Sequence, residues 1–254
     1  MKHCATFTAV FFQVRTRCNG RCAFCLASVE TDDREDLEMS YELYNDVLKQ
    51  LQSIRYYGRI AYHVNNEPLL FKELDRFVAR ATELLPRCRT QVLTNGLLLT
   101  EDWATRLINA GLKELTVNYY AHKRTDLIPR FKNVGKLIGK RIPTYRVFIR
   151  NEQEVLNSRG GTAPNKTCGG EPNGYCEYPF TQFNIDPTGL VSKCCADVRF
   201  SDVMGDLTKE SVVEIWNGEK LWHVRDCLLQ GDRQSLPNCR YCDFSGDRTQ
   251  SKTT

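Results

Sequence analysis

Apolar and polar positions follow two different periods along the first 150 residues. Residues 5–14 (ATFTAVFFQV) and 59–64 (RIAYHV) are rich in aromatic and β-branched side chains, which is typical of strands. Between them, after a cysteine-rich loop, Ser40 precedes apolar residues at helical spacing. The pattern therefore predicts a strand, a helix and a second strand in that order.

The same rhythm continues to about residue 149. It predicts helices at 72–85, 101–110 and about 124–138, and strands at 90–94, 114–118 and 144–149. Strands that alternate with helices indicate parallel strands joined by crossover helices. Five strands are too few for a closed eight-stranded barrel. We therefore expect an α/β fold, either a partial TIM-like (β/α) barrel of five to six strands or an open sheet.

The composition changes after about residue 155. Residues 158–176 are rich in Gly, Pro and Asn, and the run from 180 to 194 predicts a β-hairpin turning at Pro187-Thr188-Gly189. Two helical stretches follow, at 209–217 and 219–229, and their tryptophans should pack this region. We predict two domains, 1–155 and 156–254. The second contains too few residues for an independent core, so a bound metal would add to its stability.

Composition and charge exclude several classes of protein. The 254 residues include 35 Lys and Arg against 31 Asp and Glu, a net charge of +4, which is too even for a nucleic-acid partner. The chain contains no long apolar run, so we expect no membrane association, and its first 17 residues do not resemble a signal peptide. We expect a cytoplasmic protein. In that compartment its 12 cysteines point to metal or redox chemistry.

The sharpest motif is a run of three cysteines after the first predicted strand: Cys18, Cys22 and Cys25, spaced C-x3-C-x2-C. Closely spaced thiolates are the usual ligands of iron–sulfur clusters. Three ligands would leave one iron of a 4Fe–4S cluster open, as catalysis requires. A zinc site would need a fourth ligand, for which His3 or Cys4 is available.

This loop, with Phe24 before its last cysteine, resembles the signature of the radical S-adenosylmethionine (SAM) enzymes. In that family a Gly-Gly-Glu-Pro motif after the second strand grips the methionyl amino group of SAM. The matching stretch here is Asn65-Asn66-Glu67-Pro68, with asparagine at both glycine positions. The resemblance implies that Phe24, Asn65, Asn66 and Glu67 contribute to cofactor binding.

Two further strand ends extend the resemblance. Residues 92–96 (VLTNG) match the family's ribose-side motif, which implies cofactor contacts from Thr94 and Asn95, and Asn118 stands where further contacts would come. The implied cofactors are SAM and a 4Fe–4S cluster. The implied partners are a small-molecule substrate and a flavodoxin- or ferredoxin-type reductant.

A second set of cysteines lies in the C-terminal part: Cys176, Cys194, Cys239 and Cys242. In isolation this pattern would favour zinc. Beside a radical SAM core it resembles the short "twitch" form of the SPASM extension, which implies one auxiliary 4Fe–4S cluster with four cysteine ligands. Cys168 or Cys195 could replace one of these ligands. The simplest interpretation of Cys88 and Cys227 is that they are small buried apolar residues.

The stretch 157–161 (NSRGG) resembles the radical dehydrogenases of this family, which implies that Arg159 lies beside the substrate hydroxyl. A guanidinium stays protonated, so it would orient a hydroxyl or stabilise a developing oxygen anion. The alternative is that Arg159 only pins a glycine-rich loop. His63 and His122 either line the active site or are structural.

Three functions follow, in order of preference. The first is a radical SAM enzyme that oxidises an aminocyclitol or sugar-like alcohol by two electrons. The second is a radical SAM peptide maturase, although only 17 residues precede Cys18 and leave no room for a leader-binding domain. The third is a non-catalytic iron–sulfur or zinc protein.

Overall fold

The computed structural model describes residues 7–120, 127–166 and 174–244. The expected alternation of strands and helices is confirmed through residue 149. The strands of this part are β1 (Ala9–Phe12), β2 (Arg59–Ala61), β3 (Arg89–Thr94), β4 (Glu114–Tyr119) and β5 (Thr144–Ile149). The helices are α1 (Tyr41–Ser53), α2 (Leu74–Leu84), α3 (Glu101–Asn109) and α4 (Ile128–Ile138). Ser40 caps α1 as predicted, since its side chain accepts a hydrogen bond from the amide of Leu43.

The C-terminal part supplies the predicted hairpin and helices. After the short helix α5 (Tyr178–Thr181) come β6 (Gln182–Ile185), β7 (Leu190–Ser192) and β8 (Val203–Asp206). The helices α6 (Val212–Trp216) and α7 (Glu219–Leu229) follow, and Trp216 is buried as expected, edge-on to the ring of Phe7.

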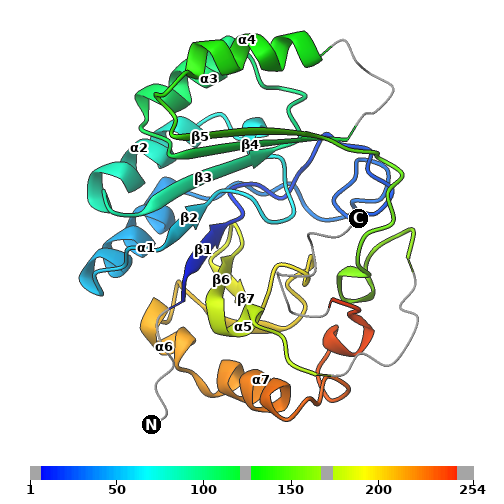
Figure 1. The fold of residues 1–254 in the computed structure, drawn as a ribbon. Helices are drawn as coiled ribbons and strands as arrows, with labels where there is room; N and C mark the ends of the chain where they lie inside the picture. Colours follow the sequence, from blue (N-terminus) through cyan, green and yellow to red (C-terminus); the bar gives the residue numbers. More distant parts are fainter. Residues whose placement is uncertain (1–6, 121–126, 167–173, 245–254) are drawn as a thin grey trace.

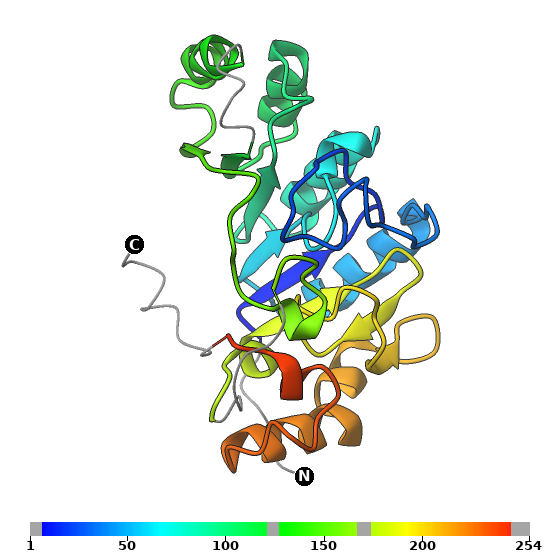
Figure 2. The ribbon, with the colours of Figure 1, turned by 90° about the vertical axis from the view of Figure 1, so that its right-hand side faces the viewer.

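All eight strands form one sheet in the order β5-β4-β3-β2-β1-β6-β7-β8. The first six are parallel, which confirms the partial barrel of five to six strands, and β7 and β8 continue it as antiparallel strands. Helices α1 to α4 cover the outer face of β1 to β5 (Figure 1). Because β6 hydrogen-bonds directly to β1, the C-terminal part is joined to the barrel through the backbone. Figure 2 shows this part, yellow to red, beside the β1 edge of the barrel.

The two faces of the sheet differ in polarity. On β1, Val10 and Phe12 point outward into the main core, where Phe12 lies edge-on to Tyr44 of α1. The inner face instead has a small apolar cluster around Ala9, Phe11 and Ala61. Alternation along a strand sends neighbouring residues to opposite faces, so the inner face is free to carry polar side chains.

Candidate active site and cysteine centres

The three cysteines of the first motif lie together in the loop between β1 and α1. Burial, with smaller contributions from Glu67 and the neighbouring thiols, raises the pKa of Cys18 to about 12, and burial also raises that of Cys22 to about 12. The amide of Gly20 donates to the Cys18 sulfur at 3.3 Å. A Cβ on Gly20 would stand 3.4 Å from the Cys18 sulfur and 3.7 Å from that of Cys22, so this loop leaves space beside its sulfurs.

A pocket opens next to this loop at the carboxyl ends of β3 and β4. Its lining includes Cys22, Asn95 and Tyr120, together with Asn19, Gly20, Arg21, Leu97, Tyr119 and Glu152. The side-chain amide of Asn95 donates to the side-chain oxygen of Asn19 at 2.7 Å, which connects the end of β3 to the cysteine loop. Asn95 therefore stands where a cofactor held by the cysteine loop would extend.

Glu67 lies at the centre of the neighbouring network and is 1% exposed. Its carboxylate accepts hydrogen bonds from the backbone amide of Leu69 at 3.0 Å, the Thr94 hydroxyl at 2.6 Å and the backbone amide of Asn95 at 2.8 Å. Burial raises the pKa of Glu67 to about 7, and these three donors partly offset the rise. The carboxylate therefore fixes the β3 end against the motif loop.

Two of the residues expected to bind the cofactor, Thr94 and Phe24, are buried in the protein. Thr94 is fully buried and bonds to Glu67 and to the Gly96 amide, so it supports the pocket wall. Phe24 is also buried, with its ring 5.1 Å from that of Tyr120. The protein interior surrounds the side chains of both residues, and the role in cofactor binding expected of them stays a prediction.

The two asparagines in place of the family's glycines behave differently. Asn66 turns back on its own loop, accepting from the Val64 amide at 2.9 Å and donating to the Tyr62 carbonyl at 3.4 Å. Asn65 is 2% exposed and reaches residues far away in the sequence: its amide donates to the Cys195 carbonyl at 3.2 Å, and its oxygen accepts from the guanidinium of Arg159.

Asn118 lies apart from the pocket beside Cys22. It lines a wider groove on the inner side of β2 to β5, together with Gln91, Thr116 and Phe148. The cofactor contact expected of Asn118 stays a prediction. Tyr120, two residues further, lines the pocket beside Cys22 and was missed by the sequence analysis.

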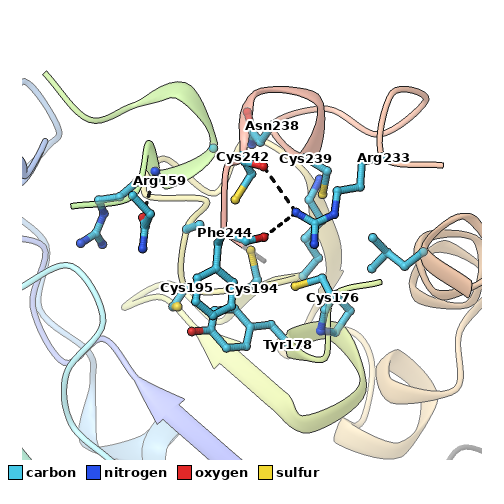
Figure 3. A pocket seen from close by; sticks show the side chains of 16 residues that line it. Arg159, Cys176, Tyr178, Cys194, Cys195, Arg233, Asn238, Cys239, Cys242 and Phe244 are labelled. Carbon is cyan, nitrogen blue, oxygen red and sulfur yellow. Dashed lines mark hydrogen bonds between the residues drawn. The ribbon is translucent and has the colours of Figure 1, made fainter. Parts of the chain in front are cut away.

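The four cysteines of the second set surround a common pocket. Figure 3 shows the sulfurs of Cys176, Cys194, Cys239 and Cys242 facing the same space, although they come from three separate segments of the chain. Burial raises the pKa of Cys176 to about 11 and that of Cys194 well above its usual value. Such buried thiols lose their protons when they bind a metal, and four cysteines are the usual ligand set of a 4Fe–4S cluster.

Two buried cations flank this pocket and have no counterpart in the sequence analysis. The guanidinium of Arg233 donates to the Phe244 carbonyl at 2.6 Å and to the Cys242 carbonyl at 3.4 Å (Figure 3). Lys193 is 1% exposed and pairs with Asp202 and with the Pro237 carbonyl. A buried lysine or arginine carries no periodic signature, so only the folded chain reveals them.

The remaining cysteines are separated by the structure. Cys195 lines the same pocket, but its sulfur lies to the side of the other four in Figure 3. Cys88 is buried as expected, whereas Cys227 is only partly buried, which corrects that prediction, because the exposed side of α7 carries it. His3, Cys4, His122 and Cys168 lie outside the described residues.

Arg159 stands in a turn with unusual backbone geometry. Arg159, Gly160 and Gly161 have φ values of +47°, +65° and +83°, and such left-handed conformations strain a residue that has a Cβ. The segment that carries Cys239 and Cys242 holds this turn, because the Ser158 hydroxyl donates to the Tyr241 carbonyl and the Ser158 amide to Asp243, both at 2.6 Å.

Polar side chains on the inner face of the barrel carry unused hydrogen-bonding atoms. Both polar atoms of Asn184, the side-chain oxygen of Gln13 and Nδ1 of His63 are buried and have no partner among the described residues. Asn184 is paired in register with Phe11, and the Phe11 ring lies edge-on to His63. Burial, with a smaller contribution from Arg59, lowers the pKa of His63 to about 3, so its ring is neutral.

Comparison with known proteins decides the family. Residues 13–157 match the Radical SAM superfamily, and residues 176–243 match the iron–sulfur cluster-binding SPASM domain. The chain belongs to the radical SAM superfamily. It is a radical SAM oxidoreductase that uses SAM and a 4Fe–4S cluster, and its SPASM region implies an auxiliary cluster.

Individual relatives agree with this assignment. The S-adenosyl-L-methionine-dependent 2-deoxy-scyllo-inosamine dehydrogenase of Niallia circulans is 30% identical over 246 residues, 97% of this chain and 96% of the relative. The crystal structure of BtrN in complex with AdoMet and 2-DOIA superposes with a TM-score of 0.83 at 29% identity, covering 95% of each chain. An open conformation of BtrN gives 0.73 at 25% identity, covering 98% and 99%.

These findings settle the sequence-based alternatives only in part. The expected membership of the radical SAM family and the expected enzymatic activity are confirmed, so the non-catalytic alternative is set aside. Within the described part of the chain, no helix is both long and apolar enough to cross a membrane.

Proposed function

We propose that this enzyme oxidises one alcohol group of an aminocyclitol to a ketone. The observation that carries the proposal is a set of buried polar atoms on the inner face, from Gln13, His63 and Asn184, that have no hydrogen-bond partner among the described residues. A buried polar group without a partner costs about 1–3 kcal/mol, so such a set favours a ligand dense in hydroxyl and amino groups. The dehydrogenase relative that covers nearly the whole chain is named for such a compound.

The ligand assignments form part of the proposal. Cys18, Cys22 and Cys25 would hold the cluster that binds SAM, since they share one loop beside the pocket that Asn95 lines. Cys176, Cys194, Cys239 and Cys242 would hold the auxiliary cluster. When bound, these groups supply a carbon radical that removes a hydrogen atom and an acceptor for one electron.

The protein's own residues orient the substrate for this chemistry. Glu67 holds the β3 end in place, so that Asn95 faces the cofactor pocket. Arg159 would face the reacting hydroxyl and stabilise negative charge on its oxygen as the proton leaves, because a guanidinium remains charged. His63 is neutral and offers a hydrogen bond through Nδ1 without adding charge.

The cellular setting is inferred from the chemistry. The cluster thiols require a reducing compartment, which favours the cytoplasm. A flavodoxin- or ferredoxin-type protein would supply the electron that starts each turnover. The chain matches a dehydrogenase relative along nearly its full length, which favours a small molecule over a peptide as the substrate.

The test is anaerobic turnover of 2-deoxy-scyllo-inosamine by the reconstituted enzyme, with the ketone and 5′-deoxyadenosine both quantified. Asn184→Ala should raise KM about tenfold or more, because it removes two hydrogen-bonding atoms from the inner face. Gln52→Ala, an exposed amide on α1, is the control. Conversion by isomerisation or elimination, with no net oxidation, would contradict the dehydrogenase assignment.

A further inference from the structure

Asn65 occupies a junction between three parts of the molecule. Its backbone carbonyl accepts from the guanidinium of Arg34 at 2.9 Å, and Arg34 is itself paired with Asp32 at 2.8 Å. Its side chain donates to the Cys195 carbonyl and accepts from the Arg159 guanidinium. One buried residue therefore connects the motif loop, the loop after Cys194 and the Arg159 turn.

The side chain is a feature of this chain and not of the motif. The family motif places glycine at this position, and a glycine offers only backbone groups. An asparagine supplies one acceptor and two donors in addition. Here the acceptor is used by Arg159 and one donor by Cys195, and the side chain is almost fully enclosed.

Within the described part of the chain, the backbone of the Arg159 turn is hydrogen-bonded to the segment that carries Cys239 and Cys242. Ser158 bonds to Tyr241 and Asp243, and a Cβ on Gly161 would come 2.8 Å from that of Tyr241, so the turn lies flat on the Cys239–Cys242 segment. Those contacts fix the backbone of the turn. The Arg159 guanidinium is held by a different contact, its hydrogen bond to the side chain of Asn65.

We propose that Asn65 is the positioning residue that aims the Arg159 guanidinium at the substrate. The arginine is then held from two directions, by the loop after β2 through Asn65 and by the segment that carries Cys239 and Cys242 through Ser158. This inference rests on the proposed role of Arg159 in alcohol oxidation. It concerns the alignment of a charged donor, which a misplacement of about 1 Å is enough to disturb.

The test compares Asn65→Ala and Asn65→Asp in the cluster-loaded enzyme. Asn65→Ala should lower the amount of ketone formed per 5′-deoxyadenosine about tenfold or more, since the charge-assisted bond to Arg159 is lost. Taking this ratio separates the loss from any change in SAM cleavage itself. Asn65→Asp keeps an acceptor for Arg159 but loses the donor to Cys195, so it should retain most of the coupling. Equal loss in both variants would overturn the role assigned to the Arg159 contact.

A double-mutant cycle with Arg159→Ala adds a decisive arm. If Asn65 acts through Arg159, the double variant should form as much ketone per 5′-deoxyadenosine as Arg159→Ala alone. Additive losses in the double variant would overturn the proposal. Asn45→Ala is the matched control, because it removes another Asn–Arg bond, to Arg80 at 2.8 Å, on the outer helices.

The failure of the proposed function can be recognised separately. If the wild-type enzyme cleaves SAM but oxidises no aminocyclitol, the substrate assignment fails. Thermal unfolding of the same two single variants and the double variant then still tests whether Asn65 and Arg159 interact, because interacting residues show non-additive changes in stability. Additive shifts there would contradict the Asn65–Arg159 bond itself.

Discussion

The two cysteine sites are built in opposite ways. Cys18, Cys22 and Cys25 come from a single loop and lie beside a pocket that continues past Asn95. Cys176, Cys194, Cys239 and Cys242 come from three segments and enclose their own space, flanked by Lys193 and Arg233. One site has three sulfurs and an adjoining pocket, whereas the other has four sulfurs and buried cations.

The difference in the number of cysteines suits the two sites to different tasks. A site with a missing protein ligand can bind a substrate-like molecule at its open metal, whereas a site with four protein ligands can only transfer electrons. The second site also organises the chain, since the loop that carries Cys239 and Cys242 holds the Arg159 turn. In the function we propose, SAM is cleaved at the first site, whereas the second site accepts an electron and aligns the Arg159 turn.

The largest expected effect comes from removing a ligand of the first site. Cys22→Ala should abolish the formation of 5′-deoxyadenosine, because the proposed cluster needs all three thiolates as ligands. Iron at the second site should remain. Product analysis by chromatography after anaerobic reduction checks this outcome, and cofactor cleavage at the wild-type rate would remove the basis for the comparison.

Removal of a ligand of the second site should produce a different pattern. Cys242→Ala should lower iron by about four atoms per chain and abolish ketone formation, while SAM cleavage survives at least in part. Cys195→Ala serves as the control and should keep its iron, since its sulfur lies to the side of the four. Equal iron loss in both variants would show that Cys195 is a ligand.

Gly161→Ala separates alignment from cluster binding. Its φ of +83° and the 2.8 Å approach to Tyr241 should strain the turn by about 1–3 kcal/mol. We expect a roughly tenfold loss of ketone per 5′-deoxyadenosine, because about 1.4 kcal/mol corresponds to one factor of ten in rate. The iron content should be unchanged. If product falls only together with iron, the turn has no role beyond the cluster.

The smallest effect concerns His63, which lies on the inner face. Its pKa is lowered to about 3, so the folded state keeps it neutral while the unfolded chain takes up a proton below about pH 6.5. Stability should therefore fall as the pH drops from about 6.5 toward 3. His63→Gln should reduce that fall by up to about 1.4 kcal/mol per pH unit. Anaerobic urea unfolding at pH 7 and pH 5 measures the difference, and parallel curves would contradict it.

Local patterns made much of this predictable. Strands and helices through Ile149 follow from periodicity, and the first cysteine site follows from the spacing of one loop. The bond between Asn65 and Arg159 spans 94 residues, and no local pattern encodes it. No local pattern encodes the pairing of β6 with β1 either. Because β6 also contributes to the main core, the stability of the C-terminal part depends less on metal than its length suggests.

The orientation of side chains at the strand ends could not be predicted from the sequence. A motif indicates that Thr94 and Asn118 occupy strand ends, but the register of the sheet decides which side chain meets the pocket. Thr94 turns inward to Glu67, and Asn118 turns to the open groove. The domain boundary predicted at residue 155 stays a prediction.

The most direct test of the account is Mössbauer spectroscopy of the anaerobically reconstituted enzyme with and without SAM. Two 4Fe–4S clusters of which only one has an open iron predict about eight irons per chain, with about one of them changing its signal when SAM is added. A spectrum with about four irons, or one in which SAM alters no iron, would contradict the division between an open and a closed site.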